Sequence, residues 1–351
     1  MAVTPGFTIQ ELWYTRCPVP TVSSLALDLG RLDHAFAAEG IRFRSLRSSD
    51  DPAIRESHYS HKLPGLFREG GNVPAIWARS NEEHTRVIGL TWVDEYQAIL
   101  AHPDSGIIEP SDLRNRRLAL PKRGNNHVDF ARSMALKGFV SALTLADLNE
   151  SAVEFVDVEA EETELREPGR AVVGGLFEAE VDALLQQQVD AIYVKGAVGN
   201  DLAHLHGLKT VIDLGSHPNP LIRINNGTPR TITVDAELIE QRSDLVVRYL
   251  ACLLETAAWA KKHPDEVVKV VAVETGGSEV SVRKAYGSEL HQRLHPDLLP
   301  EWIAGLKAHK DFLLHWGLIE HDFEIDTWID SAPLAAAKQL VNNSLSAAIY
   351  S

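Results

Sequence analysis

The sequence is poor in cysteine, in long apolar runs and in positive charge. It has two cysteines among 351 residues and a formal net charge of −15. So few cysteines cannot form a disulfide framework, which favours a reducing compartment. The negative charge argues against binding to nucleic acid or to an anionic membrane surface. No stretch approaches the roughly 18 consecutive apolar residues of a membrane span.

Signals for targeting, metals and cofactors are also missing. The first residues, Met1 to Gly6, lack the basic start and apolar core of an export signal, so we expect a cytoplasmic protein. There is no Walker or dinucleotide-binding glycine motif. The pairs His204/His206 and His291/His295 have metal-like spacing, but neither has the cysteine or carboxylate set that would complete a site. We therefore expect no cofactor and no metal, and a monomer whose partner is a small molecule.

Cys17 is the first candidate for chemistry. It follows an apolar run, Phe7 to Tyr14, that predicts the first strand, and it lies in the turn Arg16-Cys-Pro-Val-Pro20. Ligands of open α/β sheets bind beyond the carboxyl ends of the strands, and the two prolines restrict the turn. The alternative is that Cys17 is a small buried hydrophobic residue. Position alone leaves both interpretations open.

Alternating strand and helix patterns predict an α/β protein with mostly parallel sheets. A strand over 7–16, a helix closed by Gly40 and a strand over 41–46 open the chain. Residues 64–79 predict a short helix, a Gly70-Gly71 turn and a second helix. Further strands and helices follow to residue 213, and the remainder from about residue 235 is largely helical.

The length of the chain favours two domains. The unit at about 100–213 is predicted to be inserted into the first domain. This gives a first lobe of residues 1–98 and 214–351 and a second lobe of residues 99–213. A cleft between two such lobes is a preferred place for a ligand.

Two segments of the second lobe resemble solute-binding proteins for taurine, aliphatic sulfonates and thiamine-precursor compounds. They are Asp112 to Pro121, which opens the lobe, and Val189 to Tyr193, which lies near its end. The resemblance implies a two-lobed periplasmic-binding-protein type II fold with a ligand cleft between the lobes. Resemblance of fold alone says little about function.

A more specific resemblance is to the desulfinases of the dibenzothiophene desulfurization pathway. It is carried by Cys17-Pro-Val-Pro20, by His58-Tyr59 and by Arg68-Glu69-Gly70-Gly71, with Pro74 three residues further on. The chain departs from the family at Glu69, where an aromatic residue is expected, and at Tyr59, where Phe is expected. The resemblance extends over nearly the whole chain through further similar stretches at Trp259 to His263, Gln292 to Leu294, Asp326 to Trp328 and Asn342 to Leu345.

This resemblance implies hydrolysis of the carbon–sulfur bond of an aromatic sulfinate. The expected reaction converts 2-(2-hydroxyphenyl)benzenesulfinate and water to 2-hydroxybiphenyl and sulfite. The planar fork of Arg68 suits a two-oxygen anion, and the backbone amides of Gly70 and Gly71 can approach the same oxygens. The family pattern implies that Cys17, His58 and Arg68 are the catalytic residues.

The role of the thiol stays open at this point. Cys17 can protonate the ring carbon as a thiol, or attack sulfur as a thiolate. Arg68 and a charged His58 would favour the thiolate, whereas an apolar pocket would favour the thiol. His58 can also hydrogen-bond the sulfinate. Tyr59 and Phe177 are candidates for the lining around the aromatic rings, although either can equally be ordinary core.

Two rival functions share this fold. A sulfonate- or taurine-type solute-binding protein would bind an anion without catalysis and would need no reactive thiol. An enzyme of the thiamine-pyrimidine type would need a pyridoxal-binding lysine or a dense histidine set, and the sequence offers no clear candidate for either.

Overall fold

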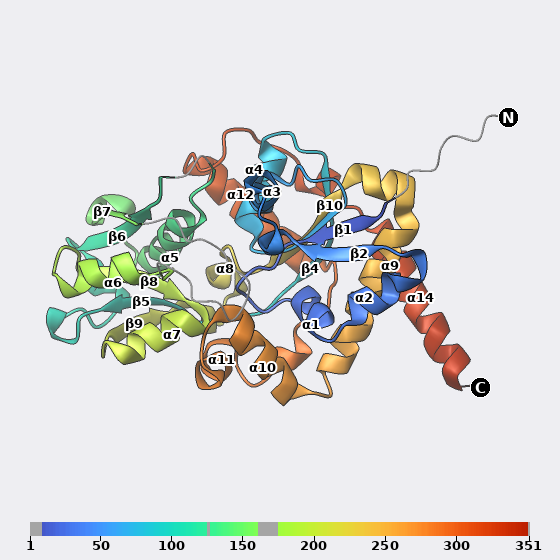
Figure 1. The fold of residues 1–351 in the computed structure, drawn as a ribbon. Helices are drawn as coiled ribbons and strands as arrows, with labels where there is room; N and C mark the ends of the chain where they lie inside the picture. Colours follow the sequence, from blue (N-terminus) through green and yellow to red (C-terminus); the bar gives the residue numbers. More distant parts are fainter. Residues whose placement is uncertain (1–8, 125–126, 161–174, 350–351) are drawn as a thin grey trace.

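The computed structural model describes residues 9–124, 127–160 and 175–349. Two five-stranded sheets lie next to one another in this part of the chain, each with its own helices (Figure 1). The start of the predicted first strand, Phe7, lies outside the described residues. The described residues thus fold as the predicted α/β protein with two lobes.

The first sheet belongs to the first lobe and has the strand order β2-β1-β3-β10-β4. Its strands are β1 (Glu11–Tyr14), β2 (Arg42–Ser45), β3 (Leu66–Gly70), β4 (Thr85–Thr91) and β10 (Arg230–Asp235). The second sheet has the order β7-β6-β8-β5-β9. Its strands are β5 (Gln97–Ala101), β6 (Arg117–Lys122), β7 (Glu154–Glu159), β8 (Ala191–Lys195) and β9 (Lys209–Asp213).

The expectation of mostly parallel sheets holds for four strands of each described sheet, which run in the same direction, and fails for the fifth. In each described sheet, one strand pairs antiparallel with both of its neighbours. These are β10, between β3 and β4, and β5, between β8 and β9. Each follows directly on a strand of the other lobe, so it enters its sheet from the opposite direction. The chain therefore crosses between the two sheets by way of these antiparallel strands. The sequence pattern did not reveal this arrangement.

The β3 segment is the most consequential difference from the expected elements. Residues 64–68 were expected to begin a short helix, but Leu66–Gly70 form a strand whose five residues are all buried. It pairs parallel with β1 and antiparallel with β10. The sequence pattern did not predict a central strand here, because it contains Arg68 and Glu69. Charged residues are rarely fully buried unless they have partners.

The first helical region is also divided. One helix was expected up to Gly40, whereas the structure has α1 (Val22–Asp28) and α2 (Arg31–Phe36). The break falls at Gly30, whose φ of 66° is left-handed and ends the first helix. Thr21 caps α1, since its hydroxyl accepts a hydrogen bond from the Ser24 amide at 3.2 Å.

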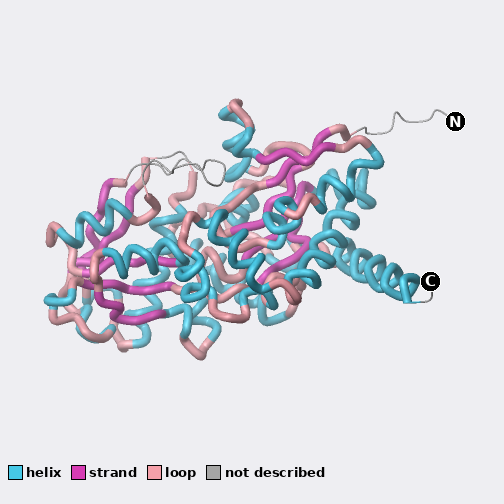
Figure 2. Tube along the Cα trace, turned by 60° about the horizontal axis from the view of Figure 1, so that its bottom comes forward, coloured by secondary structure: helices cyan, strands magenta, loops and turns pink. Residues whose placement is uncertain are grey.

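Most of the later helices agree broadly with the largely helical C-terminal part that was expected, whereas α3, α7, α8 and α13 were not anticipated. Several C-terminal helices pack on both lobes: α11 lies against α7, and α14 packs along α9 and leads away from the body (Figures 1 and 2). The helices after α2 are α3 (Pro52–Ser60), α4 (Asn72–Ser80), α5 (Phe130–Leu145), α6 (Glu178–Leu185), α7 (Gly196–Leu205), α8 (Pro220–Arg223), α9 (Ala236–Ala260), α10 (Pro264–Thr275), α11 (Glu279–Tyr286), α12 (Pro300–His315), α13 (Ile325–Trp328) and α14 (Ala332–Ile349).

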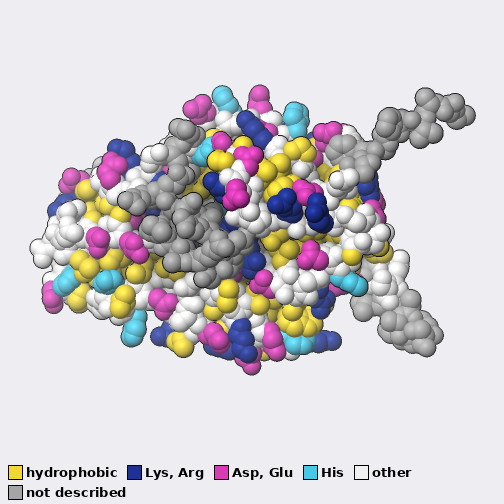
Figure 3. All heavy atoms as spheres, viewed as in Figure 1, with side chains coloured by type: hydrophobic (Ala, Val, Ile, Leu, Met, Phe, Trp, Pro, Cys, Tyr) yellow, Lys and Arg dark blue, Asp and Glu magenta, His cyan; other side chains and the backbone are white. Residues whose placement is uncertain are grey.

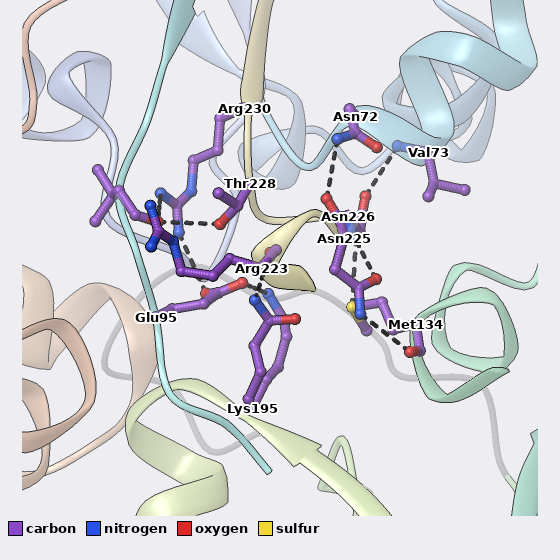
Figure 4. Close-up of polar contacts among 12 residues, drawn as sticks. Asn72, Val73, Glu95, Met134, Lys195, Arg223, Asn225, Asn226, Thr228 and Arg230 are labelled. Carbon is purple, nitrogen blue, oxygen red and sulfur yellow. Dashed lines mark hydrogen bonds and ion pairs between the residues drawn. The ribbon is translucent and has the colours of Figure 1, made fainter. Parts of the chain in front are cut away.

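A buried charge network joins the lobes where the chain crosses between them. The Glu95 carboxylate lies 2.8 Å from Lys195 Nζ of the second lobe and 3.2 Å from an Arg230 nitrogen of the first lobe (Figure 4). The side chains of Glu95 and Arg230 are fully buried. Removing one partner of such a network leaves a buried charge uncompensated, so the network fixes how the crossing segments pass one another.

Charge is distributed differently outside this junction. On the face that Figure 3 shows, acidic and basic side chains are interspersed. Among the described residues, no helix is long and apolar enough to cross a membrane.

His309 on α12 provides a test of the buried polar packing. Its Nδ1 lies 2.7 Å from Asn72 Oδ1, and Asn72 uses its amide nitrogen to donate to two backbone carbonyls. Nδ1 therefore donates, and the imidazole is neutral. Burial, with a contribution from the Lys137 charge, lowers the pKa of His309 to about 3.

We expect His309→Gln to change how stability depends on pH. In the wild type the unfolded chain takes up the proton first as pH falls below about 6.5, so His309 lowers the free energy of unfolding by about 2 kcal/mol between pH 7 and 5. The variant lacks this loss, so the stability difference between the two proteins should shrink by about that amount. Denaturant unfolding at both pH values measures it, and a constant difference would contradict a neutral buried His309.

Candidate active site

Cys17 lies in a short link between the end of β1 and the start of α1. Its side chain is 5% exposed. The Val19 amide donates to the Cys17 carbonyl at 2.8 Å, and Thr21 caps the helix that follows. The thiol is therefore held close to the carboxyl end of a strand, the position that the sequence predicted.

The structure brings Cys17 together with Arg68 and Gly70. A Cβ placed on Gly70 would lie 2.3 Å from Cys17 Sγ and 4.0 Å from Arg68 Nη2. Alternate residues of a strand point to the same face, so Arg68 and Gly70 present one face of β3 to the thiol. Glycine is required at position 70 because any side chain there would occupy the place of the sulfur.

Arg68 is buried without a compensating carboxylate. It is 1% exposed, and in the part of the chain that the structure describes no acidic side chain forms an ion pair with it. Its Nε donates to the His58 carbonyl at 3.2 Å, whereas its buried Nη1 has no hydrogen-bond partner there. Burial lowers the pKa of Arg68, and its proximity to Cys17 and Tyr59 opposes that change. An unpaired buried cation is costly, so this side chain is suited to an anionic ligand.

The Gly71 amide points to the side of β3 on which Cys17 lies. Two residues earlier, the Glu69 amide donates to the Thr15 hydroxyl at 3.2 Å, toward β1. Amides two residues apart in an extended chain point the same way, and Gly71 is extended, with φ −54° and ψ 141°. No described backbone carbonyl accepts from the Gly71 amide outside the regular elements. Arg68 Nη1 and the Gly71 amide are thus two donors without an acceptor in the described structure, and Arg68 reaches the Gly70 position beside the thiol with Nη2.

His58 and Tyr59 lie in the last turn of α3. His58 is half-buried, and desolvation of its ring lowers its pKa well below 6.5, with further contributions from the charges of Arg68 and Arg47. The imidazole is therefore neutral at neutral pH. This environment therefore disfavours the charged form of His58. That form was one of the two groups expected to favour a Cys17 thiolate.

Tyr59 belongs to an aromatic cluster that spans the two lobes. Its ring stacks on His127 at a centroid distance of 5.1 Å and lies 6.4 Å from Phe130, both of the second lobe. The His58 ring meets it edge-on at 4.8 Å. The electrostatic interaction between Tyr59 and Arg68 places this cluster close to the cation. Tyr59 is therefore positioned between the cation and the second lobe.

Phe177 is not brought to this group. It is 2% exposed and packs in a hydrophobic cluster of the second lobe with residues of β5, β6 and β8. Cys252, the other cysteine, is likewise buried in a hydrophobic cluster of α9. For Phe177 the structure therefore favours the core alternative over a place in the lining.

Glu69 is a site-forming residue that the sequence marked only as a departure from the family. Its buried carboxylate accepts hydrogen bonds from the amides of Val22 at 3.3 Å and Ser23 at 2.8 Å. Its backbone is bonded to the Thr15 hydroxyl. Glu69 therefore holds the chain on both sides of Cys17 and fixes the thiol relative to Arg68 and Gly70.

No metal site is evident in the described residues. They contain no group of three or more histidine, cysteine, aspartate or glutamate side chains that could hold an ion. The histidine pairs at 204/206 and 291/295, which have metal-like spacing, are thus not part of such a group among these residues.

Comparison with known proteins defines the class of fold first. No family model matches the chain. Among solved structures, it resembles the periplasmic aliphatic sulphonate-binding protein SsuA from Escherichia coli, with a TM-score of 0.67 and 15% identity over 92% of this chain and 93% of that chain. The protein thus has the two-lobed periplasmic-binding-protein fold that the sequence predicted.

The more specific resemblance is to one enzyme. Over 95% of its length, the chain is 26% identical to 2'-hydroxybiphenyl-2-sulfinate desulfinase of Rhodococcus erythropolis, of which 93% is covered. The crystal structure of the desulfurization enzyme DszB matches with a TM-score of 0.76 and 24% identity, over 94% of this chain and 99% of that chain. A cysteine-to-serine variant of DszB in complex with biphenyl-2-sulfinic acid gives a TM-score of 0.74. The resemblance to desulfinases is therefore confirmed over nearly the whole chain.

The contact between Gly70 and Cys17 can be tested by substitution. We expect Gly70→Ala to lower the free energy of unfolding by about 1–3 kcal/mol, because its methyl group overlaps the sulfur. Gly124→Ala is the matched control, since nothing lies within 4 Å of a Cβ there; we expect it to change stability by less than about 0.5 kcal/mol. In a Cys17→Ala background the cost of Gly70→Ala should fall. Denaturant unfolding of the four proteins measures this, and equal costs in both backgrounds would show that the two residues do not touch.

Proposed function

We propose that the chain is a cofactor-independent hydrolase that cleaves the carbon–sulfur bond of an aromatic sulfinate. The proposed reaction converts 2-(2-hydroxyphenyl)benzenesulfinate and water to 2-hydroxybiphenyl and sulfite. One observation carries the proposal: a buried arginine without a carboxylate partner lies beside a buried cysteine. The resemblance to the Rhodococcus desulfinase supports it.

In this proposal the sulfinate oxygens bind to Arg68 and Gly71. Arg68 Nη1 and the Gly71 amide both lack an acceptor in the described structure. Charge-assisted hydrogen bonds from a guanidinium are stronger than neutral ones. The anion would also supply the negative charge that Arg68 lacks.

The same electrostatics favours Cys17 as a proton donor. A bound sulfinate and a thiolate would be two anions beside a single guanidinium, and like charges at short distance disfavour ionisation of the second group. The thiol then transfers its proton to the ring carbon that carries sulfur. As the new carbon–hydrogen bond forms, the carbon–sulfur bond breaks and sulfur dioxide leaves. Water converts sulfur dioxide to hydrogen sulfite and releases a proton that restores the thiol. Attack of a thiolate on sulfur is the alternative route.

His58 and Tyr59 complete the proposed site. A neutral His58 imidazole has one donor and one acceptor nitrogen, so it can hydrogen-bond the sulfinate or the thiol without adding charge. Tyr59, stacked on His127 and near Phe130, offers an aromatic surface for the biphenyl rings. We further propose that the protein acts as a cytoplasmic monomer, with residues 1–98 and 214–351 forming the first lobe and residues 99–213 the second.

The alternative function is a solute-binding protein for sulfonates that performs no catalysis. The similarity of fold to SsuA supports it. A buried thiol next to Arg68 and Gly70 has no function in such a protein, and it therefore favours the enzyme.

Product formation with a Cys17→Ser control distinguishes the two functions. We expect the wild-type chain to release sulfite and 2-hydroxybiphenyl in equal amounts from the aryl sulfinate. Cys17→Ser should bind the sulfinate but lose most turnover, because a hydroxyl is a much weaker acid than a thiol. A sulfite assay and the fluorescence of 2-hydroxybiphenyl measure this. Binding without product by the wild type would establish the solute-binding alternative.

The Arg68 clamp predicts a loss of both affinity and rate in Arg68→Lys. An ammonium ion cannot reproduce the planar fork, and the loss of a charge-assisted hydrogen bond corresponds to about a 10- to 100-fold decrease in kcat/KM. Arg283→Lys, at an exposed ion pair with Asp265, is the control and should leave the kinetics unchanged. Equal kinetics for Arg68→Lys and wild type would disprove the clamp.

A further inference from the structure

We propose that Asn226 restricts the site to anions with two oxygens and so makes it select sulfinates over sulfonates. This inference rests on the proposed function, because it concerns the same anion site. It starts from the helix that follows Gly71. A helix N-terminus normally offers several unpaired amides to an anion, and α4 begins directly beside Arg68 and Gly70.

Asn226 occupies the free amides of α4. The Asn72 amide donates to the Asn226 carbonyl at 2.8 Å, and the Val73 amide donates to Asn226 Oδ1 at 2.9 Å. The third helical residue, Pro74, has no amide hydrogen. In the described structure these contacts leave Gly71, the N-cap residue, as the donor at this end of the helix.

Asn226 is held firmly in this position (Figure 4). It is 7% exposed, and its amide donates to Asn225 Oδ1 at 2.8 Å. Its Nδ2 reaches Met134 Sδ of the second lobe at 3.6 Å. A Cβ on Gly71 would lie 2.4 Å from Asn226 Oδ1, so the carboxamide packs directly on the glycine. Asn226 therefore cannot move aside for a ligand without losing several contacts.

A second observation points to a ligand at this place. The Nη1 atom of Arg68 is buried and unpartnered in the described structure, and Arg68 is 1% exposed. Arg68 Nη1 and the Gly71 amide can each bind one oxygen. A sulfinate has two oxygens, and the third corner of its sulfur carries a lone pair that needs no donor.

A sulfonate has a third oxygen. In this proposal His58 bonds the thiol, and the helix amides that would receive the third oxygen already donate to Asn226. An oxygen buried without a donor weakens binding by about 10- to 100-fold. Discrimination between two anions that depends on a missing hydrogen bond is larger than the discrimination that a pocket achieves by its size alone.

The test compares the binding of biphenyl-2-sulfinate and biphenyl-2-sulfonate by calorimetry. It uses the full chain with Cys17→Ser, so that the sulfinate is not consumed. We expect this protein to bind the sulfinate at least tenfold more tightly than the sulfonate. Adding Asn226→Ala frees the Val73 amide, and the ratio of the two dissociation constants should fall about tenfold.

Asn226→Asp is the matched control. Its carboxylate still accepts from Val73 but adds a negative charge, so both anions should bind more weakly while their ratio stays the same. An unchanged ratio in Asn226→Ala, or equal binding of the two anions before Asn226 is changed, would overturn the proposal. The comparison of the two anions before Asn226 is changed needs no Asn226 variant. It can therefore overturn the proposal even if Asn226→Ala fails to fold.

Failure of this inference is distinguishable from failure of the proposed function. If the wild type releases sulfite but the ratio does not respond to Asn226→Ala, the enzyme assignment holds and only the role of Asn226 is wrong. If neither anion binds and no sulfite is released, the proposed anion site is itself wrong, and this proposal fails with it.

Discussion

The burial of Arg68 without a carboxylate partner is the constraint on which the site depends. A guanidinium at 1% exposure needs negative charge, and in the described structure the Cys17 thiol and the Tyr59 hydroxyl are the groups whose charges would favour the cation. A ligand anion would replace the thiol in this role.

The chain around Arg68 is built to hold this arrangement. Glu69, on the opposite face of the same strand, binds the amides at the start of α1 and so fixes the Cys17 segment. Asn226 binds the amides at the start of α4 and so fixes the Gly70-Gly71 segment. Both acceptors come from within the protein, and in the proposed site they leave the sulfinate to Arg68 and Gly71.

Contacts at the junction between the lobes hold the two chain segments that cross between them. Glu95 neutralises one cation from each lobe, and Asn225 and Asn226 hydrogen-bond to Met134 of the second lobe (Figure 4). The Asn226 contacts thus connect the anion site to the junction. The aromatic stack of Tyr59 on His127 is a second connection between the lobes close to Arg68.

The sequence by itself determined the fold class, the position of Cys17 after the first strand and the grouping of Cys17 with Arg68 and Gly70. Local patterns and a family resemblance specify these, because apolar periodicity and turn residues act over short distances. Only the tertiary structure decided that Leu66–Gly70 is a central strand, that β5 and β10 run antiparallel and that Phe177 packs in the core of the second lobe. It also decided that His58 is neutral and that Glu69 and Asn226 take the helix amides. These features depend on contacts between residues as many as 150 or more positions apart, such as Val73 and Asn226, and neither residue reveals its partner in its local sequence.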